Sequence, residues 1–432
     1  MKLSNNRIVK NASWIVVCRI AQAVLSFVIG TISARYLGPS NYGLISYGAS
    51  VVSFLVPVVQ LGLRHVLVQE MVNHPEREGK ILGTSLVMSM VSAGLGIVGV
   101  AAFAMIANRN DTDTIVVCVL SSISLLFQCW EMIQYWFQAK LKSKYMAVTS
   151  LIAYAIASAY RLVLLVTGQS VHWFALATSL DFCIISVVLT VIYKRMSVQK
   201  LSFSWDVGKA LFAKSRYYIV SGLMVVLHSN TDRVMLTMMR GEGENGFYTA
   251  AFTCASLLGF VYEAIIDSVR PIIFESKKHD QVSFESNVKR LYTLVIYMGL
   301  LQSLVFTVLS PLIISVLYGQ EYQASVLVLQ VLTWYTAFSY TGTVRNIWIL
   351  AEDKQRIIWV INLLGAVLNI AGNFVLIPWI GAVGAAIASV ATQFFTNFVL
   401  SLLLPILRRN GQLMLGSLHP KMLKDIVRLV KR

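Results

Sequence analysis

The sequence has few charged residues for its length. Only 13% of its 432 residues are charged and 57% are hydrophobic, whereas about 25% of the residues in an ordinary soluble domain carry charge. Apolar runs of the roughly 20 residues that a helix needs to cross a bilayer recur from one end of the sequence to the other. The composition excludes a soluble domain and predicts an all-α polytopic membrane protein.

The sequence also lacks the signatures of catalysis, metal binding and nucleotide hydrolysis. Its five cysteines all fall inside apolar runs without metal-ligand spacing, which is typical of small buried hydrophobic residues. It has no Walker A motif, so ATP is not the direct energy source. We therefore expect no catalytic residue, no metal and no bound cofactor.

The apolar runs predict twelve transmembrane helices. Their expected boundaries are residues 14–34, 41–63, 81–107, 114–137, 147–167, 171–193, 217–239, 247–274, 291–317, 325–350, 357–378 and 384–407. None of the loops between them is long enough for a separate soluble domain, and no expected outer loop exceeds about ten residues, whereas a dedicated catalytic loop is usually larger.

Basic residues are distributed unevenly between the two sets of loops. With the N-terminus inside, the cytoplasmic segments hold 29 of the 36 Lys and Arg residues and the outer loops hold 3. Such asymmetry follows the positive-inside rule. It places both termini in the cytoplasm, and it explains the net charge of +16 without nucleic acid as a partner.

A basic segment divides the twelve helices into six and six. We expect an N-terminal lobe over residues 1–193, an amphipathic linker over 194–216, a C-terminal lobe over 217–407 and a basic cytoplasmic tail over 408–432. From Pro420 onward the tail alternates apolar and basic residues at helical spacing, which fits a helix lying on the inner leaflet and equally a frayed end.

The first hairpin of each lobe has a similar sequence. A shift of 205 residues pairs Arg35 with Arg240, Gly38 with Gly243 and Tyr42 with Phe247. A helix-turn-helix repeated half a chain later predicts two related lobes, and both lobes begin on the same side of the membrane. The sequence therefore predicts a parallel 6+6 repeat.

These hairpins carry a family resemblance. The stretch ARYLGPSNYG from Ala34 and the stretch TDRVMLTMMRGEGENGFYTAAF from Thr231 resemble the corresponding segments of Wzx-type polysaccharide flippases. Those proteins form the polysaccharide-transport branch of the multidrug/oligosaccharidyl-lipid/polysaccharide exporter superfamily. The resemblance implies a V-shaped pair of six-helix lobes that works by alternating access. It also implies a polyprenyl-diphosphate-linked oligosaccharide as the substrate.

Ionisable side chains in the expected helices are candidate site residues, because placing a charge at the centre of a membrane helix costs roughly 2.5–3.5 kcal/mol on insertion scales. On the first helix, Arg19, Gln22 and Ser26 follow 3–4 spacing and form one polar stripe. The stripe predicts either a water-lined cavity wall or hydrogen bonds between helices. We assign Arg19, Gln22 and Ser26 to a substrate cavity.

The seventh helix contains three neighbouring polar residues. His228 and Asp232 are one turn apart, while Arg233 points about a hundred degrees away. Each charge therefore needs its own partner. Arg233 is a candidate for the diphosphate or for an ion pair between helices, and Asp232 for a structural or gating contact.

The other charges of the spans leave similar alternatives open. Arg161 and Arg345 are candidates for the cavity wall, although both lie near helix ends where an arginine can snorkel. Glu263 and Asp267, spaced i and i+4, either carry a proton or cation or form a hydrated inner mouth in which Asp267 pairs with Arg270. Asp181 joins His228, Asp232, Glu263 and Asp267 as a candidate for coupling or gating.

The resemblance and the charges together predict a non-enzymatic flippase of the bacterial inner membrane. It would serve O-antigen, capsule or exopolysaccharide synthesis, with an H⁺ or Na⁺ gradient as the candidate driving force. Membrane lipids, a polysaccharide polymerase and a chain-length regulator are the expected partners. The alternatives are a cation-coupled multidrug exporter of the same superfamily and an integral-membrane polymerase or glycosyltransferase.

Overall fold

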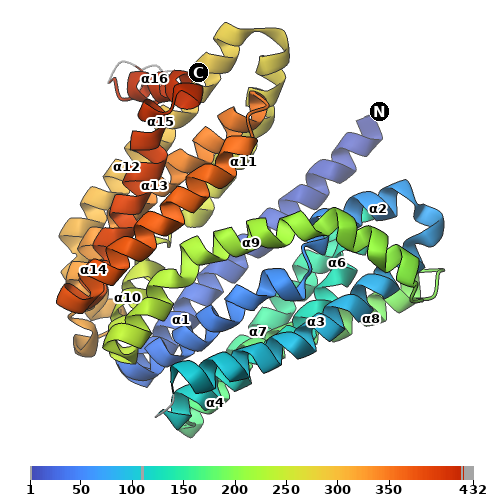
Figure 1. The fold of residues 1–432 in the computed structure, drawn as a ribbon, viewed down its shortest axis with the longest axis horizontal. Coiled ribbons are helices and arrows are strands. Elements are labelled where there is room, and N and C mark those ends of the chain that lie inside the picture. Colours follow the sequence, from blue (N-terminus) through green and yellow to red (C-terminus); the bar gives the residue numbers. More distant parts are fainter. Residues whose placement is uncertain (1, 109–110, 420–421, 423–432) are drawn as a thin grey trace. The chain divides into compact units, whose positions relative to one another are not determined.

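The computed structural model describes residues 2–108, 111–419 and 422, with side chains from Val17 onward except that of His65. These residues are almost all helical and contain no strand (Figure 1). Within them, eight helices are long and apolar enough to cross a membrane, or up to nine if a bent pair counts as one span. The prediction of an all-α multi-pass membrane protein is confirmed.

Contacts within the chain divide it into two compact units. Unit 1 comprises Met1–Asn230 and unit 2 comprises Thr231–Arg432. The division falls inside one helix, α9 (Trp205–Arg240). The linker predicted at 194–216 and the first turns of the predicted seventh span thus belong with unit 1.

Unit 1 consists of long helices joined by short breaks. In chain order they are α1 (Lys2–Val59), η1 (Leu63–His65), α2 (Leu67–Asn73), η2 (Pro75–Arg77), α3 (Glu78–Ala107), α4 (Thr112–Ser122), α5 (Ser124–Gln128), η3 (Cys129–Glu131), α6 (Met132–Ala139), α7 (Ser143–Thr167), α8 (Val171–Met196) and the first part of α9. The span from α4 to α6 is interrupted by the 3₁₀ turn η3, and such breaks often mark a functional position in a helix.

The basic linker is fixed to unit 1 by backbone contacts. The amide of Gly79 donates to Gln199 Oε1 at 3.0 Å, and the amide of Ser202 donates to the Gly79 carbonyl at 3.3 Å. A Cβ atom at Gly83 would lie 2.5 Å from the Ser202 carbonyl. The linker can approach α3 this closely because Gly83 has no side chain.

Unit 2 begins within α9 and contains the remaining helices. They are α10 (Glu242–Ala255), α11 (Gly259–His279), α12 (Gln281–Leu317), η4 (Gln320–Tyr322), α13 (Ser325–Ala351), α14 (Arg356–Phe394), the π-helical turn η5 (Phe395–Val399), α15 (Leu400–Leu403), η6 (Pro405–Leu407) and α16 (Arg408–Ser417). The bent pair of helices is α10 and α11, which meet at 44°. Buried aromatic and aliphatic side chains of α11, α12 and α13, among them Tyr262, Tyr292 and Trp348, form its core.

The first hairpin of each unit turns on a glycine with a similar backbone conformation. Gly38, between the two arms of α1, has φ 71° and ψ 171°, and Gly241, between α9 and α10, has φ 92° and ψ 173°. Only glycine adopts this region without strain. The structural shift between the hairpins is thus 203 residues, which also pairs Gly43 with Gly246. The predicted shift of 205 residues was wrong, because it matched side-chain types and ignored the backbone that the turn requires.

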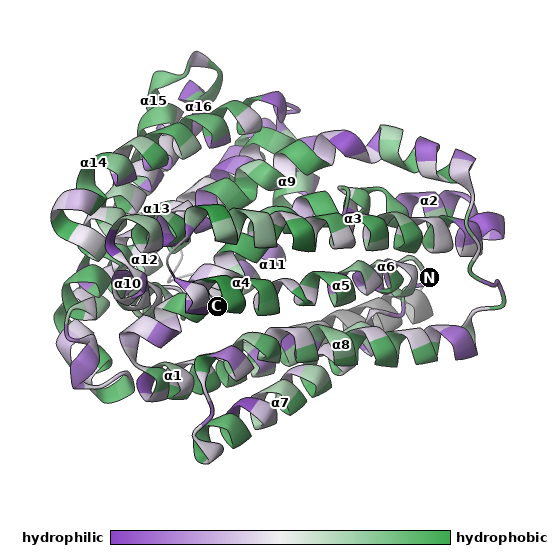
Figure 2. Cartoon of the chain, turned by 60° about the horizontal axis from the view of Figure 1, so that its bottom comes forward, coloured by the Kyte–Doolittle hydropathy of each residue, from purple (hydrophilic) through white to green (hydrophobic). Residues whose placement is uncertain are grey.

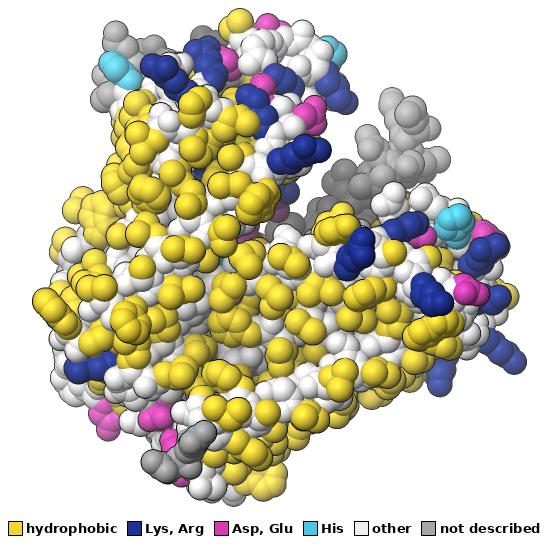
Figure 3. All heavy atoms as spheres, viewed as in Figure 1, with side chains coloured by type: hydrophobic (Ala, Val, Ile, Leu, Met, Phe, Trp, Pro, Cys, Tyr) yellow, Lys and Arg dark blue, Asp and Glu magenta, His cyan; other side chains and the backbone are white. Residues whose placement is uncertain are grey.

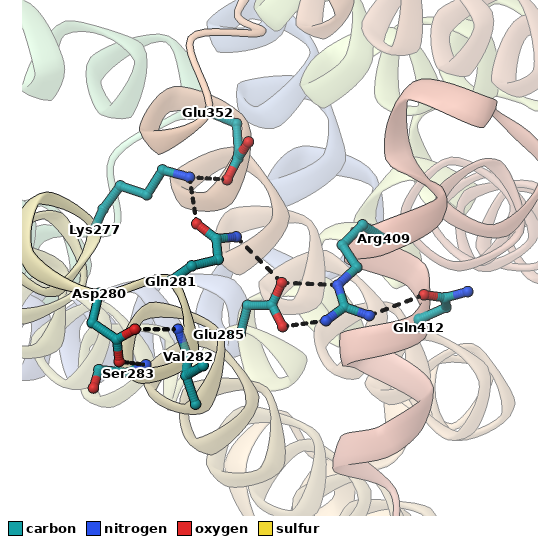
Figure 4. A network of polar contacts seen from close by, with 9 residues as sticks. All are labelled: Lys277, Asp280, Gln281, Val282, Ser283, Glu285, Glu352, Arg409 and Gln412. Atoms are coloured by element: carbon teal, nitrogen blue, oxygen red, sulfur yellow. Dashed lines mark hydrogen bonds and ion pairs between the residues drawn. The ribbon is translucent and has the colours of Figure 1, made fainter.

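Charged side chains tie the last described helix to unit 2 (Figure 4). Arg409 on α16 donates from Nε to Glu285 Oε1 at 2.8 Å, and Nη2 of the same guanidinium binds the second oxygen. Lys277 forms an ion pair with Glu352. The N-cap of α12 is Asp280, whose pKa is lowered by hydrogen bonds from the backbone amides of Ser283 and Val282.

Helix α16 is therefore part of the unit and not a free tail. The side chains of Asn410, Leu413 and Met414 are buried, and the Tyr292 hydroxyl donates to Asn410 Oδ1 at 3.0 Å. The interfacial helix that we expect from Pro420 onward lies outside the described residues, apart from Met422.

The surface of each unit matches a membrane environment. Hydrophobic residues follow most of the helix lengths (Figure 2), and Lys, Arg, Asp and Glu side chains gather at the helix ends (Figure 3). Exposed apolar side chains are spread along the outer faces of α3, α12 and α14. A surface of this kind fits lipid contact around the middle of the helices.

Candidate functional site

A polar pocket lies within unit 1. It has a volume of about 400 Å³. Its wall is formed by α1, η1, α6 and α7 through Cys18, Arg19, Gln22, Arg64, Gln134, Tyr135, Gln138, Ser143, Met146, Ala147 and Ser150. We call it the Arg19 pocket. The structure places two predicted cavity residues, Arg19 and Gln22, in this wall, whereas Ser26, which is exposed on α1, is not part of it.

The second cation of the Arg19 pocket, Arg64, was not predicted. It lies in η1, directly after Leu61 and Gly62, which have φ 51° and 64°. Two successive left-handed residues turn the chain sharply. A Cβ atom at Gly62 would lie 2.5 Å from the Ser215 carbonyl of α9, so the turn needs glycine there.

A second hollow shares Arg64 with the Arg19 pocket. Its volume is about 360 Å³, and Gln60, Pro57, Tyr218 and Ser221 are among its lining residues. The Gln60 side chain donates from Nε2 to Glu131 Oε2 at 2.9 Å. Glu131, at the η3 break, also interacts electrostatically with Arg64. A hydrogen-bonded carboxylate thus adjoins the two hollows.

Asp232 is the centre of a separate cluster in unit 2. It is only 6% exposed. Its Oδ1 accepts hydrogen bonds from Asn369 Nδ2 at 3.0 Å and Asn373 Nδ2 at 2.7 Å. Its Oδ2 accepts one from the Tyr248 hydroxyl at 2.5 Å and another from Ser389 Oγ. Four donors thus converge on one carboxylate, two on each oxygen.

The Asp232 cluster draws its members from three helices of unit 2. Asp232 comes from α9 and Tyr248 from α10, and the other three residues come from α14. Two of these, Asn369 and Asn373, are spaced i and i+4 and so face the same side of α14. Ser389 comes from the second arm of α14, after the break at Ile380 and Gly381. The break folds α14 so that both arms reach Asp232.

The neighbouring Arg233 has a different environment, as the helix geometry predicts. Its guanidinium carbon lies 5.0 Å from the centre of the Phe252 ring, within the range of a cation–π interaction. The side chain is partly buried. His228, one turn before Asp232, is partly buried on the unit 1 side of the division. The hydrogen bonds described for Asp232 come from Tyr248 and the three residues of α14.

Arg345 is buried and does not snorkel. Only 2% of it is exposed, Nη1 donates to the Thr396 carbonyl at 2.6 Å, and Nη2 donates to Asn346 Oδ1 at 3.1 Å. Thr396 lies in the π-helical turn η5, where the widened hydrogen-bond pattern frees backbone carbonyls. Arg345, a candidate for the cavity wall, does not line the Arg19 pocket. The alternative of a snorkelling arginine is wrong, because two acceptors inside unit 2 bind its Nη1 and Nη2, while its buried Nε has no acceptor among the described residues.

The remaining predicted residues are dispersed. Arg161 on α7 lies 5.6 Å from the Tyr154 ring centre and does not line the Arg19 pocket. Asp181 on α8 interacts electrostatically with Arg161, and its Oδ1 is sealed from solvent without a hydrogen-bond donor among the described residues. On α11, Glu263 is exposed and Asp267 pairs with Arg270 at 3.1 Å, as the alternative of a hydrated mouth expects.

The polar groups of the two sites differ in the ligands that they suit. No group of three or more His, Cys, Asp or Glu side chains comes together in the described part of the chain. Hard cations prefer oxygen ligands. The Asp232 cluster can supply them from its carboxylate and hydroxyl groups, and also from an asparagine whose side-chain amide rotates so that Oδ1 replaces Nδ2 beside Asp232. The Arg19 pocket offers two guanidinium groups, which bind phosphate oxygens.

The fold and these two sites define the class of the protein: a multi-pass helical membrane protein with clusters of polar side chains among its apolar helices. The chain matches the polysaccharide biosynthesis protein family over residues 8–277. This match covers more than half of the chain, and the protein belongs to that family. The predicted resemblance is thereby confirmed at the level of the family.

Relatives with known names cover nearly the whole chain. The capsular polysaccharide biosynthesis protein CapF of Staphylococcus aureus is 21% identical over 89% of this chain and 96% of its own length. A probable low-salt glycan biosynthesis flippase, Agl15 of Haloferax volcanii, is 21% identical over 89% of this chain and 80% of its own. A putative O-antigen transporter of Escherichia coli is 18% identical over 93% of this chain and 97% of its own length. The names include a flippase and a transporter, in agreement with the prediction of a non-enzymatic protein.

Solved structures have the same fold. The lipid II flippase MurJ in an inward closed conformation has a TM-score of 0.74 and 15% identity, covering 94% of this chain and 90% of its own. An inward-facing multidrug resistance MATE family transporter of the MOP superfamily has a TM-score of 0.66 and 12% identity, covering 92% and 95%. The fold is therefore that of the predicted superfamily.

Apart from Gln22, sequence reasoning missed the uncharged members of both sites. Gln134 and Gln138 in the Arg19 pocket, like Asn369 and Asn373 in the Asp232 cluster, are amides spaced i and i+4 inside apolar runs. A search restricted to charges passes over them. Paired amides at helical spacing in an otherwise apolar span are the signal that identifies such residues.

Proposed function

We propose that the protein is a flippase that moves polyprenyl-diphosphate-linked oligosaccharides from the inner to the outer leaflet of the bacterial cytoplasmic membrane. The observation that carries this proposal is the Arg19 pocket, where two guanidinium groups and three amides line a cavity inside a membrane unit. A diphosphate is a dianion or more at neutral pH, and arginine remains charged at any working pH. Membership of the polysaccharide biosynthesis family supports the same substrate class.

The topology that we propose has twelve spans in two sets of six, with both termini in the cytoplasm. In the described part of the chain, eight helices are apolar and long enough to cross the membrane. Four further spans arise if α1 and α14 each cross twice, once with each arm, and if the bent pair α10–α11 and the less apolar α13 cross once each. The similar Gly38 and Gly241 turns support a repeat between the two halves. Alternating access would then expose the substrate site first to the cytoplasm and afterwards to the outside.

A cation gradient is the proposed energy source, with Na⁺ and H⁺ as the candidates. The Asp232 cluster supports this, because a buried carboxylate surrounded by amide and hydroxyl groups can exchange its hydrogen bonds for a bound cation. Binding of a cation by Asp232 would thereby couple the packing of α9, α10 and α14 to the presence of the ion. A polysaccharide polymerase and a chain-length regulator are the proposed partners downstream.

The rival proposal is a multidrug exporter, which the MATE fold permits. Exporters of cationic drugs need carboxylates and aromatic groups in the cavity. The wall of the Arg19 pocket contains two arginines, one tyrosine and no carboxylate. This lining favours an anionic substrate.

Deletion of the gene in its native host tests the proposal. We expect surface polysaccharide to disappear and its lipid-linked precursor to accumulate on the cytoplasmic side of the membrane. Expression of the intact chain restores export, and a variant with Arg19→Gln and Arg64→Gln does not, although it inserts normally. Unchanged surface glycan together with increased sensitivity to cationic drugs would favour the exporter.

A further inference from the structure

The wall of the Arg19 pocket has two chemically different parts. Arg19 and Arg64 supply positive charge, whereas Gln22, Gln134 and Gln138 supply carboxamides. Gln134 and Gln138 lie one turn apart on α6 and so face the same side of that helix. Gln22 of α1 lines the same pocket. The pocket thus combines anion-binding groups with groups that can both donate and accept hydrogen bonds.

Most of these polar groups are not used by the protein itself. Within the part of the chain that the structure describes, the side chains of Arg19, Gln22, Arg64 and Gln138 make no hydrogen bond or ion pair, although Arg64 is attracted by Glu131 outside the wall. Gln134 contacts the hydroxyl of its neighbour Tyr135. A wall of unused donors and acceptors is available to a polar ligand.

The size and polarity of the pocket restrict what can occupy it. Ligand pockets usually measure about 300–1,000 Å³, and at about 400 Å³ this one can hold one or two sugar rings beside a phosphate. The wall of the pocket is mostly polar, and only Cys18, Met146 and Ala147 lack a strong hydrogen-bonding group in their side chains. A polyprenyl chain would leave the carboxamides unsatisfied, which disfavours it there.

Carboxamides suit sugar hydroxyl groups because each amide can donate to one hydroxyl oxygen and accept from a neighbouring hydroxyl hydrogen. We propose that Gln22, Gln134 and Gln138 recognise the sugar attached to the diphosphate, so that the Arg19 pocket selects the glycan as well as the charge. This inference rests on the proposed function. It adds a specificity site on α1 and α6, distinct from the arginines that bind any lipid diphosphate.

Binding to the purified full-length protein in lipid nanodiscs tests the inference. The first probe is the lipid-linked glycan extracted from cells that lack the gene, and the second is undecaprenyl diphosphate without sugar. We expect the intact protein to bind the glycan-bearing lipid at least tenfold more tightly. Replacing Gln134 and Gln138 together with alanine should reduce this preference to about twofold or less, since two hydrogen bonds to sugar hydroxyls are lost.

Two further variants separate recognition of the sugar from recognition of the charge. Arg19→Gln should weaken binding of both lipids, because it removes an anion-binding group. Gln69→Ala removes an exposed glutamine of α2 outside the pocket and should leave both affinities and the preference unchanged. A folding defect in the double variant would lower the affinity for both lipids, unlike the selective loss that we expect.

The outcomes are distinct. If the intact protein binds the two lipids equally, or if the Gln134→Ala, Gln138→Ala variant keeps the full preference, the sugar-recognition inference is wrong while the flippase proposal stands. If neither lipid binds, the flippase proposal itself fails.

Discussion

The side-chain amide of Asn373 on α14 donates a 2.7 Å hydrogen bond to the Asp232 carboxylate on α9. Both residues are buried, and Asn373 is 0% exposed. The bond links a helix that begins in unit 1 to the last long helix of unit 2. A buried carboxylate in a polar network loses stability when any one of its donors is removed, so the packing of unit 2 depends on this group and its four donors.

Loss of the Asp232 side chain should destabilise unit 2. Asp232→Ala removes the acceptor of four buried donors and leaves the amides of Asn369 and Asn373 with only their longer contacts of 3.4 and 3.2 Å to Ser389 Oγ and Asn369 Oδ1. We expect a loss of about 2–4 kcal/mol in unfolding free energy. Thermal unfolding of the purified protein measures it. Asp232→Asn keeps the shape and should cost less. Equal melting temperatures for the alanine variant and the unmodified protein would contradict the described hydrogen bonds.

The Asp232 cluster also predicts coupling to an ion. Transport in vesicles should accelerate under an imposed Na⁺ or H⁺ gradient, and Asp232→Asn should remove that acceleration while the protein still inserts. Imposing each gradient separately identifies the ion. Transport that ignores both gradients in the unmodified protein would leave only downhill flipping.

Neutralising the arginines should have graded effects. Arg19→Gln and Arg64→Gln each remove an anion-binding group from the Arg19 pocket, and we expect surface glycan to fall at least tenfold at an unchanged protein level, since a charge-assisted hydrogen bond contributes about 1.5–3 kcal/mol. Arg161→Gln, outside the pocket wall, should reduce export less. Quantitative immunoblots of surface glycan make the comparison. Wild-type export by both pocket variants would exclude electrostatic capture at this site.

The hairpin glycines provide a matched pair for a stability test. Gly241 has φ 92°, and an alanine there should destabilise the protein by about 1–3 kcal/mol because its Cβ is strained at positive φ. Gly243, two residues later inside α10, should tolerate alanine or gain from it. Melting temperatures of the two variants make the comparison. A Gly241→Ala variant as stable as the unmodified protein would contradict the strain expected at this turn.

The π-helical turn makes a prediction for Arg345 and its surroundings. Gly342 on α13 faces Asn397 of the turn so closely that a Cβ atom would collide with the Asn397 amide. Gly342→Ala should therefore separate α13 from η5 and destabilise unit 2 by about 1–3 kcal/mol. Arg345→Met should destabilise it too, by leaving the Thr396 carbonyl without its donor. Unchanged thermal stability of both variants would show that Arg345 does not hold the turn.

Local patterns in the sequence were sufficient for the class of fold and for part of each site. Hydropathy predicted the membrane helices, and 3–4 spacing placed Arg19 and Gln22 on one face of α1. Helix rotation separated Asp232 from Arg233, and the structure gives them different partners. Each of these inferences depends on residues within a few turns of one another.

Contacts between distant segments were not predictable in this way. Arg64 reaches the Arg19 pocket only because Leu61 and Gly62 turn the chain back. Arg345 looked like a residue at a helix end, and its acceptor is a carbonyl 51 residues away in a π-helical turn. Neither the reversal nor the π-turn has a hydropathy signal, because both are properties of the backbone.

Reconstitution of the purified protein tests the central claim most directly. Lipid-linked glycan from cells lacking the gene is placed in proteoliposomes, and its outward movement is followed by a membrane-impermeant glycan-modifying enzyme. The account predicts that vesicles with the intact protein expose the glycan at least tenfold faster than protein-free vesicles, and that the Arg19→Gln, Arg64→Gln variant loses most of this difference. Equal rates with and without the intact protein, under Na⁺ and H⁺ gradients alike, would contradict it.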